Sequence, residues 1–317
     1  MGLLQYRIPG EETFFAKGEW ELKTLASLVE GDFVLTTFNK EEVYVFNEED
    51  GEKNYSFHPE EPYAVSEQEY YAGLSAFKSE FEVRGIAKAI YSRIHKVEKS
   101  EDFKLEDAFN RLCEKYPNAF VYLISGENTG TWMGATPETL VSSKKNAFYT
   151  MSLAGTKKTK ELSWTQKEIE EQAFVTDFIL EKLRKAEVSN LQSDGPKDIF
   201  TGAVYHLKTD ITFSTPTENI KQLVEVLHPT PAVCGVPTDK ALDLIAKHEE
   251  HSRGFYAGVI GRVGQERCDL FVNLRCMQVF ENSLGLYVGG GITKDSVVEA
   301  EYQETINKAQ TLLRVLV

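Results

Sequence analysis

The 317-residue sequence has no long apolar run and only four cysteines, and these shortages exclude several classes of protein. No apolar stretch approaches the roughly 18 residues that cross a bilayer, so we expect no membrane span. The first residues, MGLLQYRIPGEETFFAKGEW, lack a basic start followed by a long apolar run, so we predict no signal peptide and a cytoplasmic location. The cysteines show neither a CxxC pair nor zinc-type spacing, and we expect buried free thiols.

Positive charge is scarce as well. The chain has 35 lysines and arginines against 49 aspartates and glutamates, a formal net charge of −14. Such a protein is a poor general binder of nucleic acid or of an anionic membrane, so we expect neither as a partner. Any anionic ligand would need local cations or a metal. The chain also lacks GxGxxG after a strand, a P-loop, HExxH and GxSxG, which leaves nucleotide-binding and triad-hydrolase functions without support.

The apolar patterning predicts strands and helices in alternation. Residues 1–75 read as short strands and turns, with a hairpin over 42–58 around Asp50-Gly51. A long helix is predicted over 163–186, with Ser163 and Gln166 as its capping box, and a polar loop over 187–198. Other helices are expected over 66–83, 105–117 and 296–317, and other strands over 119–125, 146–156, 268–280 and 285–293. This order favours a layered α+β fold over a doubly wound parallel sheet.

Two predicted helices carry carboxylates at unusual positions. Glu168 and Glu171 share one helix face, and so do Glu301, Glu304 and Lys308. Each face continues into an apolar stripe, where acids are costly unless they are paired or bound to a cation. Ordinary exposed helices, with a Glu304–Lys308 pair, are one interpretation. A shared Mg²⁺ site is the other, because carboxylates hold this ion while substrate and water fill the remaining positions.

Two further segments are unusual in their backbone chemistry. VGGGIT (288–293) places three glycines at a strand end, where they mark either a turn or a close approach of backbone that could cradle a carboxylate. LHPTPAVCGVP (227–237) contains three prolines, so it is neither helix nor central strand.

Ten segments in a fixed order resemble the chorismate-utilising enzymes, and within that family the isochorismate synthases. They are IAKAIYSR (86–93), GATPETLV (134–141), LAGT (153–156), KEIEEQ (167–172), VYHLKTDI (204–211), LHPTPAVCGVP (227–237), RGFYAGVIG (253–261), NLRC (273–276), GGGI (289–292) and EYQETINK (301–308). The resemblance implies one domain over 1–317, in which a divergent part, 1–70, completes the fold of the motif-bearing core, 70–317. It implies an α+β architecture with a large, mainly antiparallel two-layer sheet, helices packed outside, and an active-site cleft.

The resemblance also implies a reaction, in which water attacks C2 of chorismate while the C4 hydroxyl departs. Lys88 matches the general base and Glu138 the general acid. The acid must keep its proton near neutral pH, so its surroundings should raise the pKa of Glu138. Without the resemblance, these residues would be interpreted as a surface lysine and a turn glutamate.

The remaining site residues follow from the same motifs. Glu171 and Glu304 match direct Mg²⁺ ligands, and Glu168 and Glu301 match outer carboxylates that hold metal-bound water. Arg275 and Lys308 match the residues that take the enolpyruvyl carboxylate. The rest of the predicted substrate pocket comprises Gly155, Thr156, His206, Ala232, Tyr256, Gly289 and Gly291. His206 is placed near the ring, although a core histidine bonded to backbone is an alternative.

The Pro-rich segment distinguishes the subfamilies. It matches an active-site wall, whose stiffness avoids an ordering cost on binding. Its sequence resembles that of isochorismate synthases rather than that of the aminating relatives. The salicylate-forming relatives have threonine where this chain has Ala232. We therefore expect a monomeric Mg²⁺-dependent isochorismate synthase for menaquinone biosynthesis, with no amidotransferase subunit. A siderophore pathway, a salicylate synthase, an anthranilate or aminodeoxychorismate synthase, and a non-catalytic chorismate-binding protein are the alternatives.

Overall fold

The structure is a computed structural model that describes residues 2–157, 159–201, 204–264 and 266–316. Its strands are β1 (Gly2–Arg7), β2 (Phe14–Lys23), β3 (Phe33–Thr36), β4 (Val43–Glu48), β5 (Lys88–Glu98), β6 (Phe120–Gly126), β7 (Gly130–Thr136), β8 (Thr139–Lys144), β9 (Ala147–Lys157), β10 (Ser189–Phe200), β11 (Tyr205–Ser214), β12 (Gly235–Val236), β13 (Val259–Arg262), β14 (Arg267–Val272), β15 (Cys276–Val279) and β16 (Ser283–Ile292). The helices are α1 (Glu67–Ser79), α2 (Phe81–Arg84), α3 (Leu105–Lys115), α4 (Gln166–Lys185), α5 (Ile220–Leu227), α6 (Thr238–His248) and α7 (Val298–Leu313).

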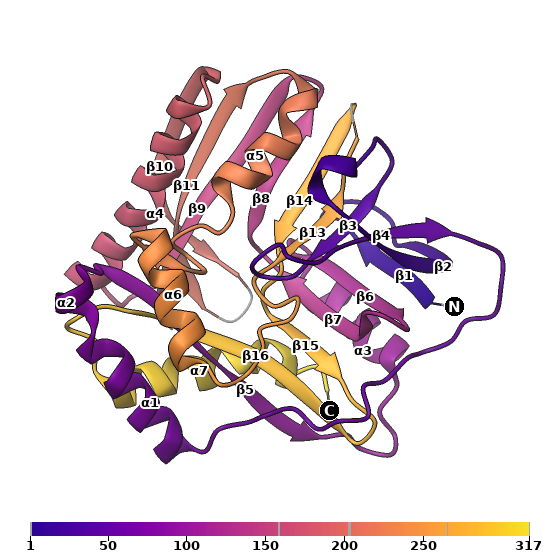
Figure 1. Ribbon diagram of the computed structural model, residues 1–317, viewed down its shortest axis with the longest axis horizontal. Helices are drawn as coiled ribbons and strands as arrows, with labels where there is room; N and C mark the ends of the chain where they lie inside the picture. The colour runs from indigo at the N-terminus through magenta and orange to yellow at the C-terminus, as the bar shows by residue number, and fades with distance from the viewer. Residues whose placement is uncertain (1, 158, 202–203, 265, 317) are drawn as a thin grey trace.

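All sixteen strands join one sheet in the order β10-β11-β9-β8-β14-β13-β3-β4-β2-β1-β6-β7-β15-β16-β5-β12. The N-terminal strands β1 to β4 occupy the middle of this order. Neighbouring strands pair antiparallel throughout, for example β16 with β5 and β11 with β9. In Figure 1 the strands at one end of this order, from β10 to β14, stand in the upper part of the view, and β16 and β5 cross the lower part. The predicted antiparallel α+β architecture is confirmed.

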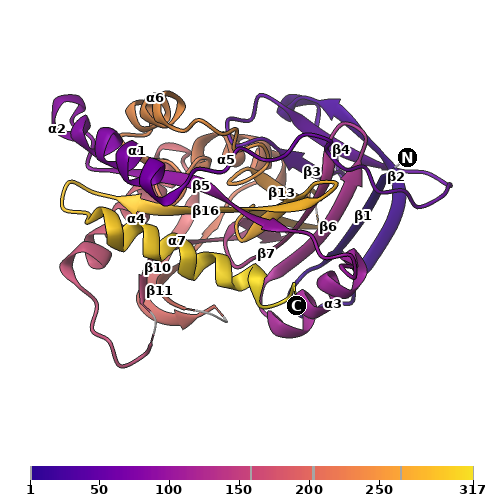
Figure 2. The same ribbon diagram turned by 90° about the horizontal axis from the view of Figure 1, so that it is seen from below.

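The helices cover the two halves of the sheet from outside. Helix α4 packs on β9 and β11, and α5 packs on β8. At the other end of the order α7 runs along β16, whereas α6 packs against β5 and β12. Figure 2 shows α6 and α7 on opposite sides of these strands. Helix α3 packs on β6 and β7, over a second apolar cluster that α7 also covers.

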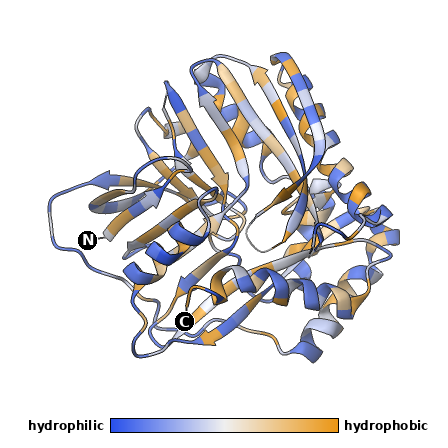
Figure 3. Cartoon of the chain, turned by 180° about the vertical axis from the view of Figure 1, so that it is seen from behind, coloured by the Kyte–Doolittle hydropathy of each residue, from blue (hydrophilic) through white to orange (hydrophobic). Residues whose placement is uncertain are grey.

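Helix α4 shows how the sequence specifies this packing. Its apolar residues Val175, Ile179 and Leu183 recur at helical spacing and are all buried. Figure 3 shows the resulting alternation of hydrophobic and hydrophilic residues along the helices. The helix begins at Gln166 rather than at Ser163, because Thr165 and Glu168 form the capping box. The prediction of a Ser163–Gln166 cap was therefore wrong.

Three other local predictions were wrong. Residues 187–198 do not form a loop, because most of them belong to β10, an exposed edge strand that pairs only with β11. A strand exposed on both faces needs no apolar alternation, so its composition resembles that of a loop. The hairpin over 42–58 does not form either, because β4 pairs with β2 and β3. The single strand over 268–280 is divided into β14 and β15, with Arg275 in the left-handed region between them at φ 50°.

Two expectations from composition can also be compared with the structure. The four cysteines are free, and all except the half-buried Cys113 are buried, as predicted. Among the residues that the structure describes, no helix is long and apolar enough to cross a membrane.

Candidate active site

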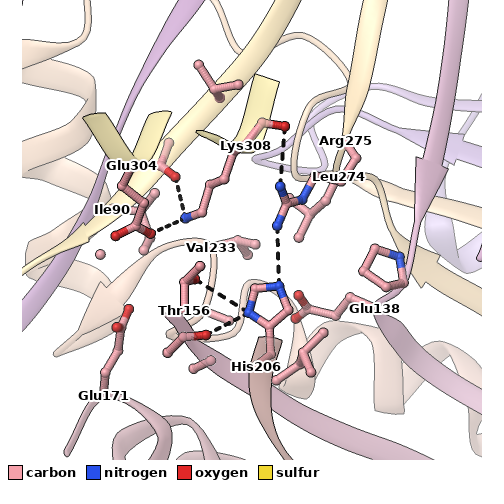
Figure 4. Close-up of a pocket in the computed structure, with 18 of the residues that line it drawn as sticks. Ile90, Glu138, Thr156, Glu171, His206, Val233, Leu274, Arg275, Glu304 and Lys308 are labelled. Atoms are coloured by element: carbon pink, nitrogen blue, oxygen red, sulfur yellow. Dashed lines mark hydrogen bonds and ion pairs between the residues drawn. The ribbon is translucent and has the colours of Figure 1, made fainter. Parts of the chain in front are cut away.

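A pocket between the two ends of the sheet gathers every predicted site residue except Glu168 and Glu301. Its lining includes Lys88, Glu138, Gly155, Thr156, Glu171, His206, Ala232, Tyr256, Arg275, Gly289, Gly291, Glu304 and Lys308, many of which are drawn in Figure 4. Strands β5 and β16 contribute from one end of the strand order, and β9 and β11 from the other. Helices α4 and α7 add the carboxylates. The curvature of the sheet is therefore what assembles the pocket.

Lys88 is the most deeply buried charged residue of the pocket. It begins β5, between β12 and β16, and is 0% exposed. Its Nζ lies 2.8 Å from Oε1 of Glu171 on α4, yet it makes no aligned hydrogen bond within the described part of the chain. Any use of Lys88 as a base requires this ion pair to open.

Glu138 lies in the turn between β7 and β8 and is 3% exposed. Burial raises the pKa of Glu138 to about 7, even though the charges of Lys88, Arg275 and Lys308 act in the opposite direction. A substantial fraction of the molecules therefore carries a proton on this carboxyl group near pH 7. The rise in the pKa of Glu138 that the sequence predicted is confirmed by this environment.

Arg275 presents its guanidinium to the pocket beside His206. Nδ1 of His206 donates to the carbonyl of Gly155 at 2.6 Å, so Nε2 is free to accept from Arg275 at 3.3 Å. Burial and the nearby guanidinium lower the pKa of His206 to about 3, which keeps the imidazole neutral. Among the ion pairs of the described residues, none involves Arg275. Its guanidinium is thus available to an incoming carboxylate.

Lys308 lies one turn after Glu304 on α7. Its Nζ donates to the carbonyl of Gly289 at 2.7 Å and lies 2.6 Å from Oε1 of Glu304. Burial opposes ionisation of Glu304, but Lys308 and Lys167 outweigh that effect and hold the pKa of Glu304 below its ordinary value. The predicted Glu304–Lys308 pair is present.

Glu168 and Glu301 lie outside the pocket lining. The Glu168 carboxylate accepts from the backbone N–H of Thr165 at 2.8 Å as part of the α4 cap. Glu301 is 2% exposed, and one of its oxygens pairs with Lys167. Its other oxygen, Oε2, is buried without a hydrogen-bond partner among the described residues. Such an orphaned oxygen is costly unless water or a cation completes it.

The carboxylate oxygens in and beside the pocket are ligands of the kind that Mg²⁺ prefers, although the carboxylates do not lie together in one cluster. No three His, Cys, Asp or Glu side chains within the described ranges are close enough to hold an ion. The glycine run nevertheless makes room for carboxylates. A Cβ on Gly291 would lie 2.0 Å from Oε1 of Glu171, and one on Gly290 would lie 3.1 Å from Oε2 of Glu301. Gly290 and Gly291 thus permit the close backbone approach that the sequence suggested. The residues fit a cation once Glu171 and Glu304 leave their lysine partners.

Sequence reasoning missed the apolar part of the lining. Ile90, Leu153, Val233 and Leu274 complete the pocket, together with Tyr287, which stacks on Tyr256 at 5.6 Å. All five adjoin or lie within the segments singled out in the sequence. Their position beside functional residues was the only feature of the sequence that could have identified them, because apolar pocket residues cannot otherwise be distinguished from core residues.

Comparisons with known proteins identify the family of the chain. Residues 29–317 match the family described as chorismate binding enzyme. Isochorismate synthase DhbC of Bacillus subtilis is 31% identical over 256 residues, which are 73% of this chain and 63% of DhbC. The vibriobactin-specific isochorismate synthase of Vibrio cholerae is 27% identical over 263 residues, which are 78% of this chain and 66% of that enzyme. The chain spans less than two thirds of the length of either relative.

A solved structure supports the fold independently. The menaquinone-specific isochorismate synthase MenF from Escherichia coli superposes with a TM-score of 0.84, covering 100% of this chain and 89% of MenF at 19% identity. The family match covers nearly the whole sequence and includes all the residues of the pocket. This chain belongs to the chorismate-binding enzyme family.

Proposed function

We propose that the protein is an isochorismate synthase that isomerises chorismate to isochorismate. The observation that carries the proposal is the burial of Glu138, which raises its pKa to about 7, in a pocket that also holds Lys88, Arg275 and Lys308. One buried acid, one buried amine and two cations are the groups that this reaction on a dicarboxylate needs.

Each residue has a distinct task in the proposal. Lys88 takes a proton from the water that attacks C2, after its pair with Glu171 has opened. Glu138 gives its proton to the departing C4 hydroxyl. Arg275, held by His206, binds the enolpyruvyl carboxylate together with Lys308. The apolar side chains of the lining pack against the ring.

We further propose that the enzyme uses Mg²⁺. Glu171 and Glu304 would hold the ion directly, and Glu168 and Glu301 would hold its water ligands. A bound Mg²⁺ supplies positive charge against the ring carboxylate and the charge that develops there. The orphaned Oε2 of Glu301 and the close approach of Glu171 to Gly291 support this assignment.

The decisive experiment is product analysis. The purified protein is incubated with chorismate and Mg²⁺, without ammonia, and the products are separated with mass detection. We expect a new species of chorismate's mass that rises to an equilibrium ratio and is absent with a chelator. Salicylate with pyruvate would assign the protein to the lyase relatives instead and would show that Ala232 does not prevent that step. An aminated ring formed only with ammonia would assign it to the anthranilate or aminodeoxychorismate synthases.

The pathway is a separate proposal. We assign the product to menaquinone biosynthesis, although the matched relatives include one menaquinone-specific and one vibriobactin-specific enzyme by name. The test is complementation of two bacterial strains, each lacking the isochorismate synthase of one pathway. Restored menaquinone in the first strain supports the assignment, and restored siderophore alone contradicts it.

A further inference from the structure

A buried arginine behind the pocket wall donates hydrogen bonds from all three guanidinium nitrogens and so connects two segments that line the site. Arg253 is 5% exposed and does not itself line the pocket. Its Nε and Nη2 donate to the two carboxylate oxygens of Glu249, each at 2.7 Å. Its Nη1 donates to the carbonyl of Val233 at 2.8 Å, and Nη2 also donates to that of Ile90 at 3.1 Å.

The carboxylate of this pair is equally well held. The side chain of Glu249, which follows the last turn of α6, is 3% exposed. Besides the arginine, its Oε1 accepts from the backbone N–H of Ser92 at 2.7 Å and from the Ser92 hydroxyl at 2.8 Å. The guanidinium also lies 4.3 Å from the ring centre of Phe38. Arg253 and Glu249 therefore form a fixed, fully bonded unit.

This unit connects the Pro-rich wall with the strand that carries the proposed base. Val233 follows Ala232 in the wall, and Ile90 lies two residues after Lys88, so their side chains point to the same face of β5. All four residues line the pocket. Between the wall and β5, the two-residue strand β12 forms a short ladder, which is flanked by backbone hydrogen bonds from Ala87 to Val236 at 2.9 Å and from Ile90 to Cys234 at 2.7 Å. The guanidinium of Arg253 adds two hydrogen bonds to carbonyls, one to Val233 in the wall and one to Ile90 in β5.

We infer that Arg253 is a positioning residue for the isomerisation, which sets the spacing between the wall and Lys88; this inference rests on the proposed function. A planar guanidinium reaches four acceptors in a fixed geometry, whereas an ammonium does not. Reacting groups depend steeply on such spacing, because small misplacements cost much of the rate.

A purely structural ion pair is the competing explanation, and the variants are chosen to separate the two. Arg253→Lys keeps the charge but cannot satisfy Glu249, Val233 and Ile90 together. The double variant Arg253→Met with Glu249→Gln removes both charges and so avoids leaving one buried and unpaired. Arg262→Lys is the matched control, because Arg262 pairs with Asp269 at 2.9 Å on β13 and β14, and neither residue lines the pocket.

The readouts are the Km for chorismate, kcat, chorismate affinity by calorimetry, and the thermal midpoint. We expect both Arg253 variants to raise Km and to weaken chorismate binding by about tenfold or more, because the wall contacts the substrate. Arg262→Lys should leave Km unchanged. A structural role alone would reduce the folded fraction, and hence the apparent kcat, without moving Km.

Unchanged Km and chorismate affinity in folded Arg253→Lys would overturn the inference, whatever happens to its thermal midpoint. If the double variant fails to fold, Arg253→Lys decides the matter. Failure of the proposed function is distinguishable, since the wild-type protein would then produce no isochorismate in the same assay.

Discussion

Nε2 of His206 accepts a hydrogen bond from Nη2 of Arg275 at 3.3 Å. The other ring nitrogen, Nδ1, carries the proton of the neutral imidazole, which leaves Nε2 as the acceptor. Nδ1 faces the carbonyl of Gly155 at 2.6 Å, and a carbonyl can only accept. His206 therefore acts on Arg275 as an orienting group. Its lowered pKa, about 3, places its titration well below neutral pH.

Replacement of His206 by Phe should raise the Km for chorismate while the kcat–pH profile keeps its shape. The change removes one hydrogen bond to a charged group, worth roughly 2 kcal/mol, or more than tenfold in affinity. Steady-state kinetics over pH measure both quantities. Loss of a titrating limb in the variant would mean that His206 transfers protons after all.

Glu138 predicts a pH dependence of both turnover and stability. Burial raises its pKa from about 4.5 to about 7, so kcat should fall as pH rises through about 7 and the proton is lost. For stability, the contribution of the neutral carboxyl is complete below about pH 4.5 and disappears as pH rises through about 7. Glu138→Gln cannot ionise, so it should gain stability relative to the wild type across that interval. Parallel stability curves would contradict the burial argument.

Lys88→Ala should abolish turnover and leave Mg²⁺-dependent chorismate binding largely intact. In the proposed reaction the Lys88 amine removes a proton, and it is not among the groups assigned to hold either substrate carboxylate. Isothermal calorimetry with chorismate and Mg²⁺ checks binding, and product analysis checks turnover. Full activity in this variant would remove Lys88 from the mechanism.

Gly291→Ala should weaken Mg²⁺ binding by about tenfold or more, a loss typical of disturbed metal-site support. Its Cβ would lie 2.0 Å from Oε1 of Glu171 and 2.9 Å from Cε of Lys88, so the carboxylate must move. Gly285→Ala on the same strand is the control, because its Cβ would meet apolar side chains such as Phe280 at 3.0 Å instead. Calorimetric titration with Mg²⁺ compares them, and equal affinities would refute the role of Gly291.

Lys167→Met should enlarge the rise in thermal midpoint that Mg²⁺ produces. Lys167 pairs with Glu301, so its removal leaves a buried, unpaired carboxylate whose charge an added Mg²⁺ would compensate. Lys185→Met on the same helix is the control, since Lys185 pairs with Glu181 at the surface. If both variants respond to Mg²⁺ alike, Lys167 does not compete with the ion.

The sequence predicted which residues line the pocket better than it predicted which of these residues pair with one another. Motif order identified Lys88, Glu138 and Arg275, and the structure brings them into one cavity. Nothing local marks Lys88 as buried, because its burial arises from strands far away in the chain, β12 and β16, on either side of it. Glu168 is the opposite case: its spacing from Glu171 placed both residues on one helix face, but a local cap holds its carboxylate.

Strand assignments failed where burial was low. The edge strand β10 is almost entirely exposed, so it carries none of the alternation by which strands are recognised. The sequence predicted a hairpin turn at Asp50-Gly51, but β4 pairs with β2 and β3 instead. Tertiary pairing overrode a local preference there.

Because the pocket lies where β5 and β16 meet β9 and β11, its occupant touches both ends of the sixteen-stranded sheet. A ligand in that position acts as a non-covalent cross-link. At one hundred times its Kd it would add about 2.7 kcal/mol to the free energy of unfolding. If chorismate binds there as proposed, it should stabilise the arrangement of strands that forms its own binding site, and the ligand-free protein should be the state most open to local unfolding and proteolysis.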